Sequence, residues 1–238
     1  MTDRAGSTCI VAHRGAHDPA VENTLPAFER AIALGADMVE FDVRRSSDGA
    51  LVVHHDSSVR VGESELAVGE LTHRDLCRAV GFHVPTLEEV LDLCSGRIGL
   101  DIELKEAGFE DEVVRAVRGR YGPDRVIITS FLDEALAAVR DIARDIRTGL
   151  LVYAATPPGP AGLDALLGRL GRLKAHALAP GQTMVDKTLV ETLNRRDIPV
   201  YVWTVNDPRM MTRLLGLGVH GLITDRVEEA LQARAGAD

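Results

Sequence analysis

Pairs of acidic residues with strand spacing are the first feature of this sequence that could do chemistry. Glu40 and Asp42 stand two positions apart in the largely apolar run 38–44, and Asp101 and Glu103 repeat the pattern later in the chain. Side chains alternate along a strand, so the two acids of a pair share one face. Buried carboxylates without a counter-charge cost several kcal/mol each, so we predict a metal site in this first stretch.

Histidines lie close to these acids in the sequence. His13 ends the apolar run 8–12, and His54 and His55 stand near the end of the predicted strand 51–56. A single histidine after a strand is most often a hydrogen-bonded structural residue. A pair, however, could divide the work of general acid and general base near neutral pH. Because His54 and His55 are adjacent in a strand, we expect only His55 to face the acids.

Strands that alternate with helices are predicted along the chain. Eight units of this kind in 238 residues are close to the roughly 250 residues of a closed (β/α)8 TIM barrel, which is the fold that we predict. An open doubly wound sheet is the alternative, but the turn 13–17 lacks the glycine-rich phosphate loop of its nucleotide-binding forms. The predicted strands lie at Ile10, Val39, Leu100, Ile127, Leu150, Ala177, Val202 and Leu222.

A barrel would bring polar residues from separate strands to one mouth, because the carboxyl ends of its parallel strands lie together. Lys105 is one of only three lysines and stands on the acidic face of its strand, so we expect it to be functional. Trp203 is the only tryptophan, and either packing or substrate contact would explain it. The residues expected at the mouth are His13, Glu40, Asp42, Glu103, Lys105, Ser130, Trp203, Asn206 and Asp225.

Local signals predict how the first units are connected. Asn23 is the expected N-cap of a helix that ends at Gly35. The segment 57–84 is polar and weakly patterned, with a short helical stretch near 72–80, so we expect a short insertion that could cover the site as a loop. No linker separates two domains, and we expect a single domain over residues 1–238.

Composition excludes several classes of partner. A net charge of −9 without a basic cluster argues against nucleic-acid binding, which depends on Lys and Arg. Cys9, Cys77 and Cys94 are odd in number and widely spaced, so we expect buried free thiols rather than disulfides or a zinc site. Without a signal core or an apolar run of about 18 residues, we expect a soluble cytoplasmic protein that binds a small molecule.

The ordered motifs of this chain resemble those of the glycerophosphodiester phosphodiesterases. The resemblance covers nearly the whole chain and is specific as a set, although each motif alone is weak. After Asp56 the chain departs from the family pattern, since 57–62 replaces an Arg-Thr-Thr-like segment and a longer insertion, so the head group of the substrate stays open. The matching segments are Ala12-His13-Arg14-Gly15, Glu22-Asn23-Thr24, Ala27-Phe28, 35–43, Asp48-Gly49, His55-Asp56, Pro85-Thr86-Leu87, 101–105, Ser130-Phe131, 203–206 and 221–225.

The resemblance implies hydrolysis of glycerophosphodiesters to glycerol 3-phosphate and an alcohol. In that family, the residues that match Glu40, Asp42 and Glu103 bind one divalent cation, Mg²⁺ or Ca²⁺. Those that match His13 and His55 are the catalytic acid and base. The chemistry of the residues agrees, because an all-oxygen ligand set suits a hard cation that also accepts phosphate oxygens.

The resemblance also implies substrate contacts. Arg14 and Lys105 match residues that contact the phosphate, and Trp203 matches one that lines the substrate pocket. A catalyst for this reaction must neutralise the phosphate, align a nucleophile and protonate the leaving oxygen. Glycerol carries a hydroxyl beside the ester, so attack by this hydroxyl through a cyclic phosphate is our hypothesis for the first step.

Two other functions would use many of the same residues. A metal-dependent barrel lyase or isomerase acting on another phosphorylated metabolite would need the carboxylates but not two histidines as an acid and base pair. A non-catalytic phosphate-binding protein would need neither the carboxylates nor the two histidines. Release of an alcohol from glycerophosphocholine or glycerophosphoethanolamine separates these possibilities.

Overall fold

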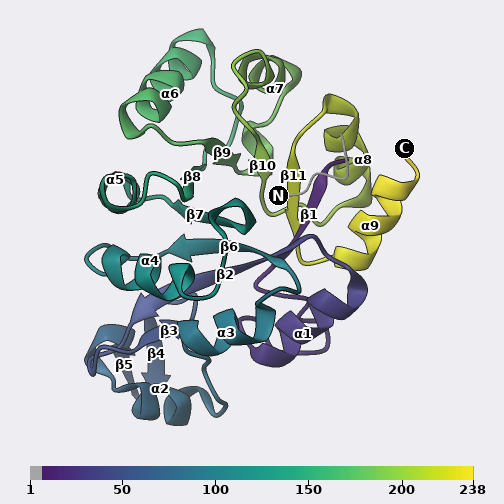
Figure 1. Cartoon of the computed structure of the whole chain (residues 1–238). Helices are drawn as coiled ribbons and strands as arrows, with labels where there is room; N and C mark the ends of the chain where they lie inside the picture. Colours follow the sequence, from purple (N-terminus) through teal and green to yellow (C-terminus); the bar gives the residue numbers. More distant parts are fainter. Residues whose placement is uncertain (1–6, 238) are drawn as a thin grey trace.

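A nearly closed ring of parallel strands forms the centre of the computed structural model, which describes residues 7–237 (Figure 1). The ring contains β1 (Cys9–His13), β2 (Met38–Arg45), β6 (Gly99–Leu104), β7 (Val126–Ser130), β8 (Arg147–Val152), β9 (Ala177–Pro180), β10 (Tyr201–Val202) and β11 (Gly221–Thr224). They pair in the order β10-β11-β1-β2-β6-β7-β8-β9. Parallel bridges from Leu178 to Val200 and from Gly181 to Trp203 join the two ends of this order. The predicted TIM barrel is confirmed.

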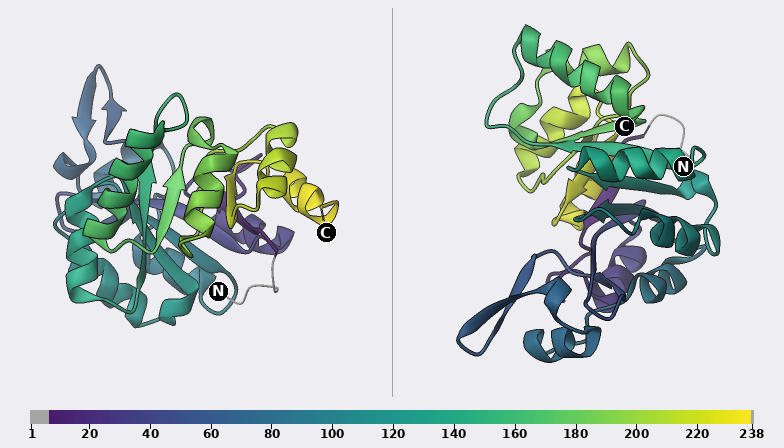
Figure 2. Two further views of the ribbon diagram at one scale, coloured as in Figure 1. Left: turned by 90° about the horizontal axis from the view of Figure 1, so that it is seen from above. Right: turned by 90° about the vertical axis from the view of Figure 1, so that its left-hand side faces the viewer.

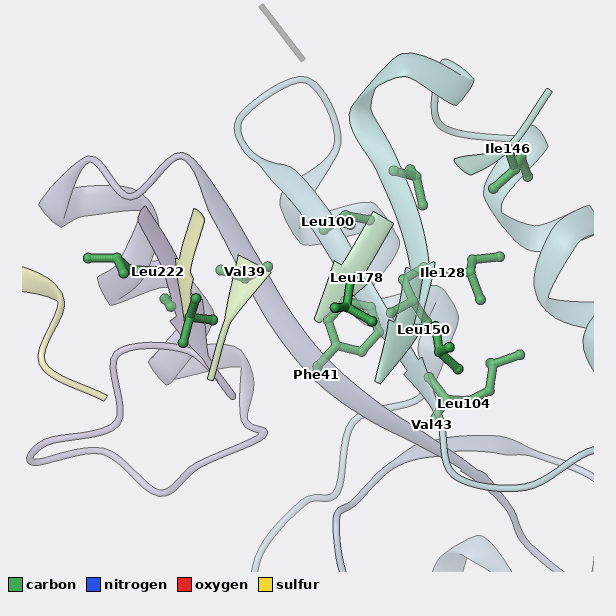
Figure 3. Packing of buried hydrophobic residues seen from close by; sticks show 14 of the residues in the cluster. Val39, Phe41, Val43, Leu100, Leu104, Ile128, Ile146, Leu150, Leu178 and Leu222 are labelled. Atoms are coloured by element: carbon green, nitrogen blue, oxygen red, sulfur yellow. The ribbon is translucent and has the colours of Figure 1, made fainter. Parts of the chain in front are cut away.

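Helices follow the strands and surround the ring on its outside (Figure 1). Their apolar faces pack on the outward side chains of the strands. Figure 3 shows some of these strand side chains, among them Val39, Phe41 and Leu150. This layer between strands and helices is the main hydrophobic core. The helices around the ring are α1 (Leu25–Leu34), α3 (Leu87–Cys94), α4 (Glu110–Arg118), α5 (Asp133–Ile142), α6 (Pro160–Leu173), α7 (Lys187–Asn194), α8 (Pro208–Leu217) and α9 (Val227–Ala235), with short 3-10 helices η2 (Pro123–Arg125) and η3 (Gln182–Met184).

Alternation along β2 separates the core from the site. Val39 and Phe41 lie in the outer core, so Glu40 and Asp42 point to the inside of the barrel. Deeper inward positions of the ring are apolar and form a separate cluster that fills the barrel interior. This cluster contains Cys9, Val11, Met38, Ile127, Leu151, Ala177, Ala179, Tyr201 and Ile223.

The strand register places the acids of neighbouring strands side by side. Glu40 pairs with His13 on β1 and with Asp101 on β6, and Asp42 pairs with Glu103. Neighbouring strands lie about 4.8 Å apart, so inward side chains at paired positions come within reach of one another. The two acidic pairs of the sequence therefore meet at one place.

The segment 57–84 is an ordered insertion. The short helix expected near 72–80 is present, but the part before it is structured rather than a loop. It contains the hairpin of β4 (Ser58–Val61) and β5 (Ser64–Ala67), η1 (Val68–Glu70) and α2 (His73–Val80). The hairpin projects away from the barrel in both views of Figure 2. Its own small apolar cluster stabilises the insertion, and the short strands offered too few apolar positions for the sequence pattern to show. The cluster contains Val52, Val59, Val68, Leu71, Leu76 and Val84.

Two local predictions in the first units are wrong. The strand β3 (Leu51–Val53), antiparallel to β2, ends before His54, because the chain leaves the sheet there. The N-cap of α1 is Thr24 rather than Asn23. Asn23 has a left-handed backbone, with φ of 55°, and its side chain hydrogen-bonds to Asp42 instead.

Candidate active site

A cavity of about 270 Å³ opens at the carboxyl ends of the barrel strands. Seven of the eight predicted site residues line it: His13, Arg14, Glu40, His55, Glu103, Lys105 and Trp203. The eighth, Asp42, is buried beside them with 1% of its surface exposed. Within the described chain, no residue of 57–84 lines this cavity, so the insertion does not form its wall.

Three carboxylates form the acidic part of the site. Glu40, Asp42 and Glu103 are all buried, and each offers an oxygen within 4.8 Å of the other two. Burial, together with the charge of Asp42, raises the pKa of Glu40 well above its ordinary value and that of Glu103 to about 7. The three carboxylates therefore destabilise one another in their ionised form, and a cation between them would relieve this repulsion.

Asp42 is oriented from several sides. The Asn23 amide donates a hydrogen bond to its Oδ2 at 2.8 Å, and the Arg14 Nε lies 3.2 Å from the same oxygen. Its Oδ1 is buried without a hydrogen bond, although the Lys105 ammonium lies at 3.3 Å. Burial alone would raise the pKa of Asp42, but the charges of Lys105 and Arg14 lower it overall. The buried Oδ1 is thus an ionised oxygen with a free lone pair, as a metal ligand requires.

Lys105 lies between two of the carboxylates. Its Nζ donates a hydrogen bond to Glu103 Oε1 at 2.7 Å and lies 3.3 Å from Asp42 Oδ1. A positive charge is therefore already favoured at this position. Lys105 and Arg14 supply two positive charges, whereas the three carboxylates carry three negative charges when all are ionised. A further cation would therefore be favoured at this place.

Arg14 owes its position to an unusual backbone. It follows β1 with a positive φ of 54°, and its backbone N–H donates to Glu40 Oε2 at 3.0 Å. Gly15 follows with φ of 84°, and a Cβ at this residue would lie 2.8 Å from Ala27. Glycine is therefore required there, because the turn approaches α1 too closely for any side chain.

His13 is held by a carboxylate from the opposite end of the sequence. Its Nδ1–H donates to Asp225 Oδ1 at 2.6 Å, and its Nε2 lies 4.0 Å from Glu40 Oε2. His17 reaches the same Asp225 oxygen at 3.2 Å. Burial alone would raise the pKa of Asp225, but hydrogen bonds from His13 and His17 lower it well below its ordinary value. Asp225 is therefore an ionised acceptor that fixes the His13 ring.

His55 reaches the cavity from the chain that follows β3. The Arg44 guanidinium donates two hydrogen bonds to its backbone carbonyl, at 2.9 and 2.8 Å. The His55 Nδ1 pairs with Asp56 Oδ1 at 2.8 Å. His54 does not line the cavity, as expected, and burial lowers its pKa. Alternation along 38–44 places Arg44 on the same face as Glu40 and Asp42, but its support of His55 was not predicted from the sequence.

The remaining wall of the cavity is apolar. Trp203 packs edge to face against Phe131, with 5.5 Å between ring centroids, and its Nε1–H donates to the Ala179 carbonyl at 2.7 Å. Leu151 and Ile223 complete this side. The cavity thus combines a charged half with a half that can pack carbon atoms.

Other polar residues predicted at the mouth support the site or the fold. Ser130 is fully buried and donates to the Leu104 carbonyl at 2.7 Å, which is a structural role. Asn206 donates to Asp225 Oδ2 at 2.6 Å and accepts from its backbone N–H. Asp101, not predicted as a site residue, lines the cavity and accepts from Thr129 at 2.7 Å. Its spacing before Glu103 was the signal that could have found it.

The cavity lies where TIM-barrel enzymes hold their active sites, so fold and site together define a protein of this class. The model of the glycerophosphoryl diester phosphodiesterase family matches residues 13–229. This chain therefore belongs to the glycerophosphodiester phosphodiesterase family. No helix in residues 7–237 has the length and apolar character needed to cross a membrane.

Individual relatives match over nearly their whole length. A glycerophosphodiester phosphodiesterase of Caldanaerobacter subterraneus is 33% identical, over 93% of this chain and 95% of its own. One of Bacillus altitudinis is 31% identical, over 95% of this chain and 98% of its own.

Solved structures of the same kind share the fold. A glycerophosphodiester phosphodiesterase of Thermotoga maritima has a TM-score of 0.79 and 27% identity, over 94% of this chain and 97% of its own. A phosphodiesterase of Oleispira antarctica, solved in complex with the product sn-glycerol-3-phosphate, has a TM-score of 0.82 and 25% identity, over 95% and 96%.

Proposed function

We propose that this protein hydrolyses glycerophosphodiesters to glycerol 3-phosphate and an alcohol. Membership of the family supports the reaction, and the product bound to the Oleispira antarctica phosphodiesterase supports the glycerol phosphate half of the substrate. The observation that carries the proposal is one cavity in which two histidines, an acidic cluster and two cationic side chains meet. No single element of the fold requires this combination.

The proposed ligands of one divalent cation are Glu40, Asp42 and Glu103. Their oxygens lie close together, the Asp42 Oδ1 lacks a hydrogen bond, and the pKa of Glu103 is raised to about 7, all of which a cation would relieve. Oxygen ligands favour Mg²⁺ or Ca²⁺ over zinc. When bound, such a cation would supply charge neutralisation at the phosphate.

His13 and His55 are the proposed acid and base. Asp225 holds the Nδ1 side of His13 and Asp56 holds that of His55, so the Nε2 atom of each ring is left for proton transfer. Arg14 and Lys105 would bind the phosphate oxygens. Trp203 lies on the apolar wall and would pack against the carbon atoms of the substrate.

The cytoplasm is the proposed compartment and one domain the proposed organisation. Cys77 and Cys94 are free thiols, which supports a reducing compartment. The barrel and its insertion account for all the described residues, 7–237.

The proposal is tested by incubating the protein with glycerophosphocholine or glycerophosphoethanolamine in the presence of Mg²⁺ or Ca²⁺. We expect equimolar release of glycerol 3-phosphate and of choline or ethanolamine. Release of phosphocholine, or no release from either substrate with either cation, would contradict the proposal. His13→Ala is the control for contaminating hydrolases.

A further inference from the structure

A second cluster of metal-binding side chains lies on the insertion, away from the barrel mouth. His73, Cys77 and His83 each offer a ligand atom, and these atoms lie within 4.8 Å of one another. The three residues line an open surface pocket that shares no lining residue with the active-site cavity. The role proposed above for the barrel uses none of them.

The local fold brings these three residues together. His73 and Cys77 stand one turn apart on α2, so they share one face of the helix. Gly81 ends the helix with a left-handed φ of 81° and turns the chain back. His83 then lies beside His73, with 5.7 Å between the ring centroids.

Both histidine rings already have one nitrogen engaged. His73 Nε2 donates to the Val84 carbonyl at 2.8 Å, and His83 Nε2 contacts both carboxylate oxygens of Glu89 at 3.0 Å. Glu89 is itself fixed, because it accepts from the Thr86 backbone N–H at 2.8 Å in a capping box of α3. These partners hold the proton on Nε2 and leave Nδ1 with its lone pair, which is the arrangement of histidines that bind metals.

Cys77 differs from the other two cysteines. Cys9 and Cys94 are buried, whereas Cys77 is half-buried at the surface pocket, which corrects the expectation of three buried thiols. Its Sγ accepts a hydrogen bond from the Val84 N–H at 3.4 Å. This contact fixes the position of the sulfur at the pocket.

We propose that His73, Cys77 and His83 bind a divalent transition metal ion such as Zn²⁺, with the fourth position open to water or a small anion. Two imidazoles and a thiolate form a set that prefers Zn²⁺ or Co²⁺ to Mg²⁺ or Ca²⁺, whereas carboxylates have the opposite preference. The protein would thus bind two kinds of cation at two separate sites. This reverses the expectation from cysteine spacing alone, which argued against a zinc site.

The charges around the pocket permit this site. Arg74 and Arg78 are on its wall, and Arg78 is paired with Asp75 at 3.1 Å. Both arginine side chains are exposed, so solvent and salt screen their repulsion of a cation.

The first test is a titration of the full chain with Co²⁺ in excess Mg²⁺. We expect one equivalent to bind with the near-ultraviolet absorption of a thiolate-to-cobalt transition. Cys77→Ser should abolish this absorption, and His83→Ala should weaken binding by at least about tenfold. Arg78→Ala and Glu103→Gln, which leave the three ligands intact, should retain the absorption. Circular dichroism would verify that each variant is folded.

The second test uses the difference in exposure among the cysteines. In the native protein we expect a thiol-alkylating reagent to react at Cys77 before Cys9 and Cys94, and stoichiometric Zn²⁺ to slow that reaction at least about tenfold. Alkylation at the same rate with and without Zn²⁺, or a cobalt spectrum that does not depend on Cys77, would overturn the proposal. Neither readout depends on phosphodiesterase activity, so failure here and failure of the proposed function are distinguishable.

Discussion

His13 and Asp225, which stand 212 residues apart in the sequence, are joined by a hydrogen bond of 2.6 Å between Nδ1 and Oδ1. His13 is the last residue of β1, and Asp225 directly follows β11, the neighbouring parallel strand, whose register places Thr224 beside Ala12. The bond therefore depends on the pairing of the first strand of the ring with the last. It selects the His13 tautomer that has Nε2 free for the substrate.

Asp225→Asn should lower kcat by about 10²- to 10⁴-fold, because an amide does not fix the His13 ring and its tautomer as the carboxylate does. His17→Gln is the matched control, since His17 contacts the same oxygen but does not line the cavity, and we expect little change. Steady-state kinetics over a range of pH would measure both. Equal losses of kcat in the two variants would show that Asp225 affects the rate only by supporting the structure.

His55→Ala should lower the rate by about 10²- to 10⁴-fold and abolish one limb of a bell-shaped pH profile. His54→Ala is the control, because His54 does not line the cavity. His54→Ala should lower the stability of the protein rather than the rate of the reaction. A loss at His54 as large as that at His55, with the melting temperature intact, would reverse the assignment.

Chelation should abolish turnover if the three carboxylates hold the cation. Glu40→Gln or Glu103→Gln should raise the metal concentration for half-maximal activity at least about tenfold, equivalent to about 1.4 kcal/mol. Metal titration of the activity measures this effect. Arg45→Gln, at a half-buried ion pair with Glu112 on the outside of the barrel, is the control. Unchanged metal dependence in both acid variants would refute the ligand assignment.

The metal-free protein should lose stability as pH rises from about 4 to about 7. Burial raises the pKa of Asp101 and of Glu103 to about 7 in the folded state. A carboxyl group whose pKa is raised by folding stabilises the folded state fully below its unfolded pKa, which is about 4. This stabilisation is lost as the pH rises from that value to the folded pKa. Thermal melts of chelated protein at pH 5 and pH 8 would measure this.

Asp101→Asn removes one of the two carboxyl groups with a raised pKa and keeps an oxygen that can accept a hydrogen bond from Thr129. The variant should therefore lose less stability than the parent between pH 5 and pH 8. Added Mg²⁺ or Ca²⁺ should stabilise the parent more at pH 8, where the carboxylates are ionised. A parent protein that is more stable at pH 8 than at pH 5 without metal would contradict the raised pKa values.

A substrate analogue without the glycerol 2-hydroxyl tests the route of attack. Intramolecular attack has effective molarities of about 10⁵ to 10⁸ M, so the hydroxyl beside the ester is a favoured nucleophile. The deoxy analogue should bind with similar affinity and turn over at least about a hundredfold more slowly. Comparable turnover of both substrates would show that water attacks directly.

The sequence by itself determined the class of fold and most of the site. Alternation along 38–45 and 99–104 required one face to be apolar and the other acidic, and eight repeats of strand and helix left few arrangements other than a barrel. Alternation with a period of two residues is a local property of the chain, so it can be recognised without knowledge of tertiary contacts. The places of Glu40 and Glu103 at the cavity follow from this alternation, whereas those of Arg14, in a left-handed turn, and His55, beyond the end of β3, do not.

Only the tertiary structure decided which side chains hold others in place. The contacts of Asn23 with Asp42 and of Arg44 with the His55 carbonyl join separate elements, and they depend on a left-handed backbone or on the exact end of a strand. The meeting of His73, Cys77 and His83 likewise depends on the turn at Gly81. Such contacts arise from how elements pack, which spacing in the sequence does not encode.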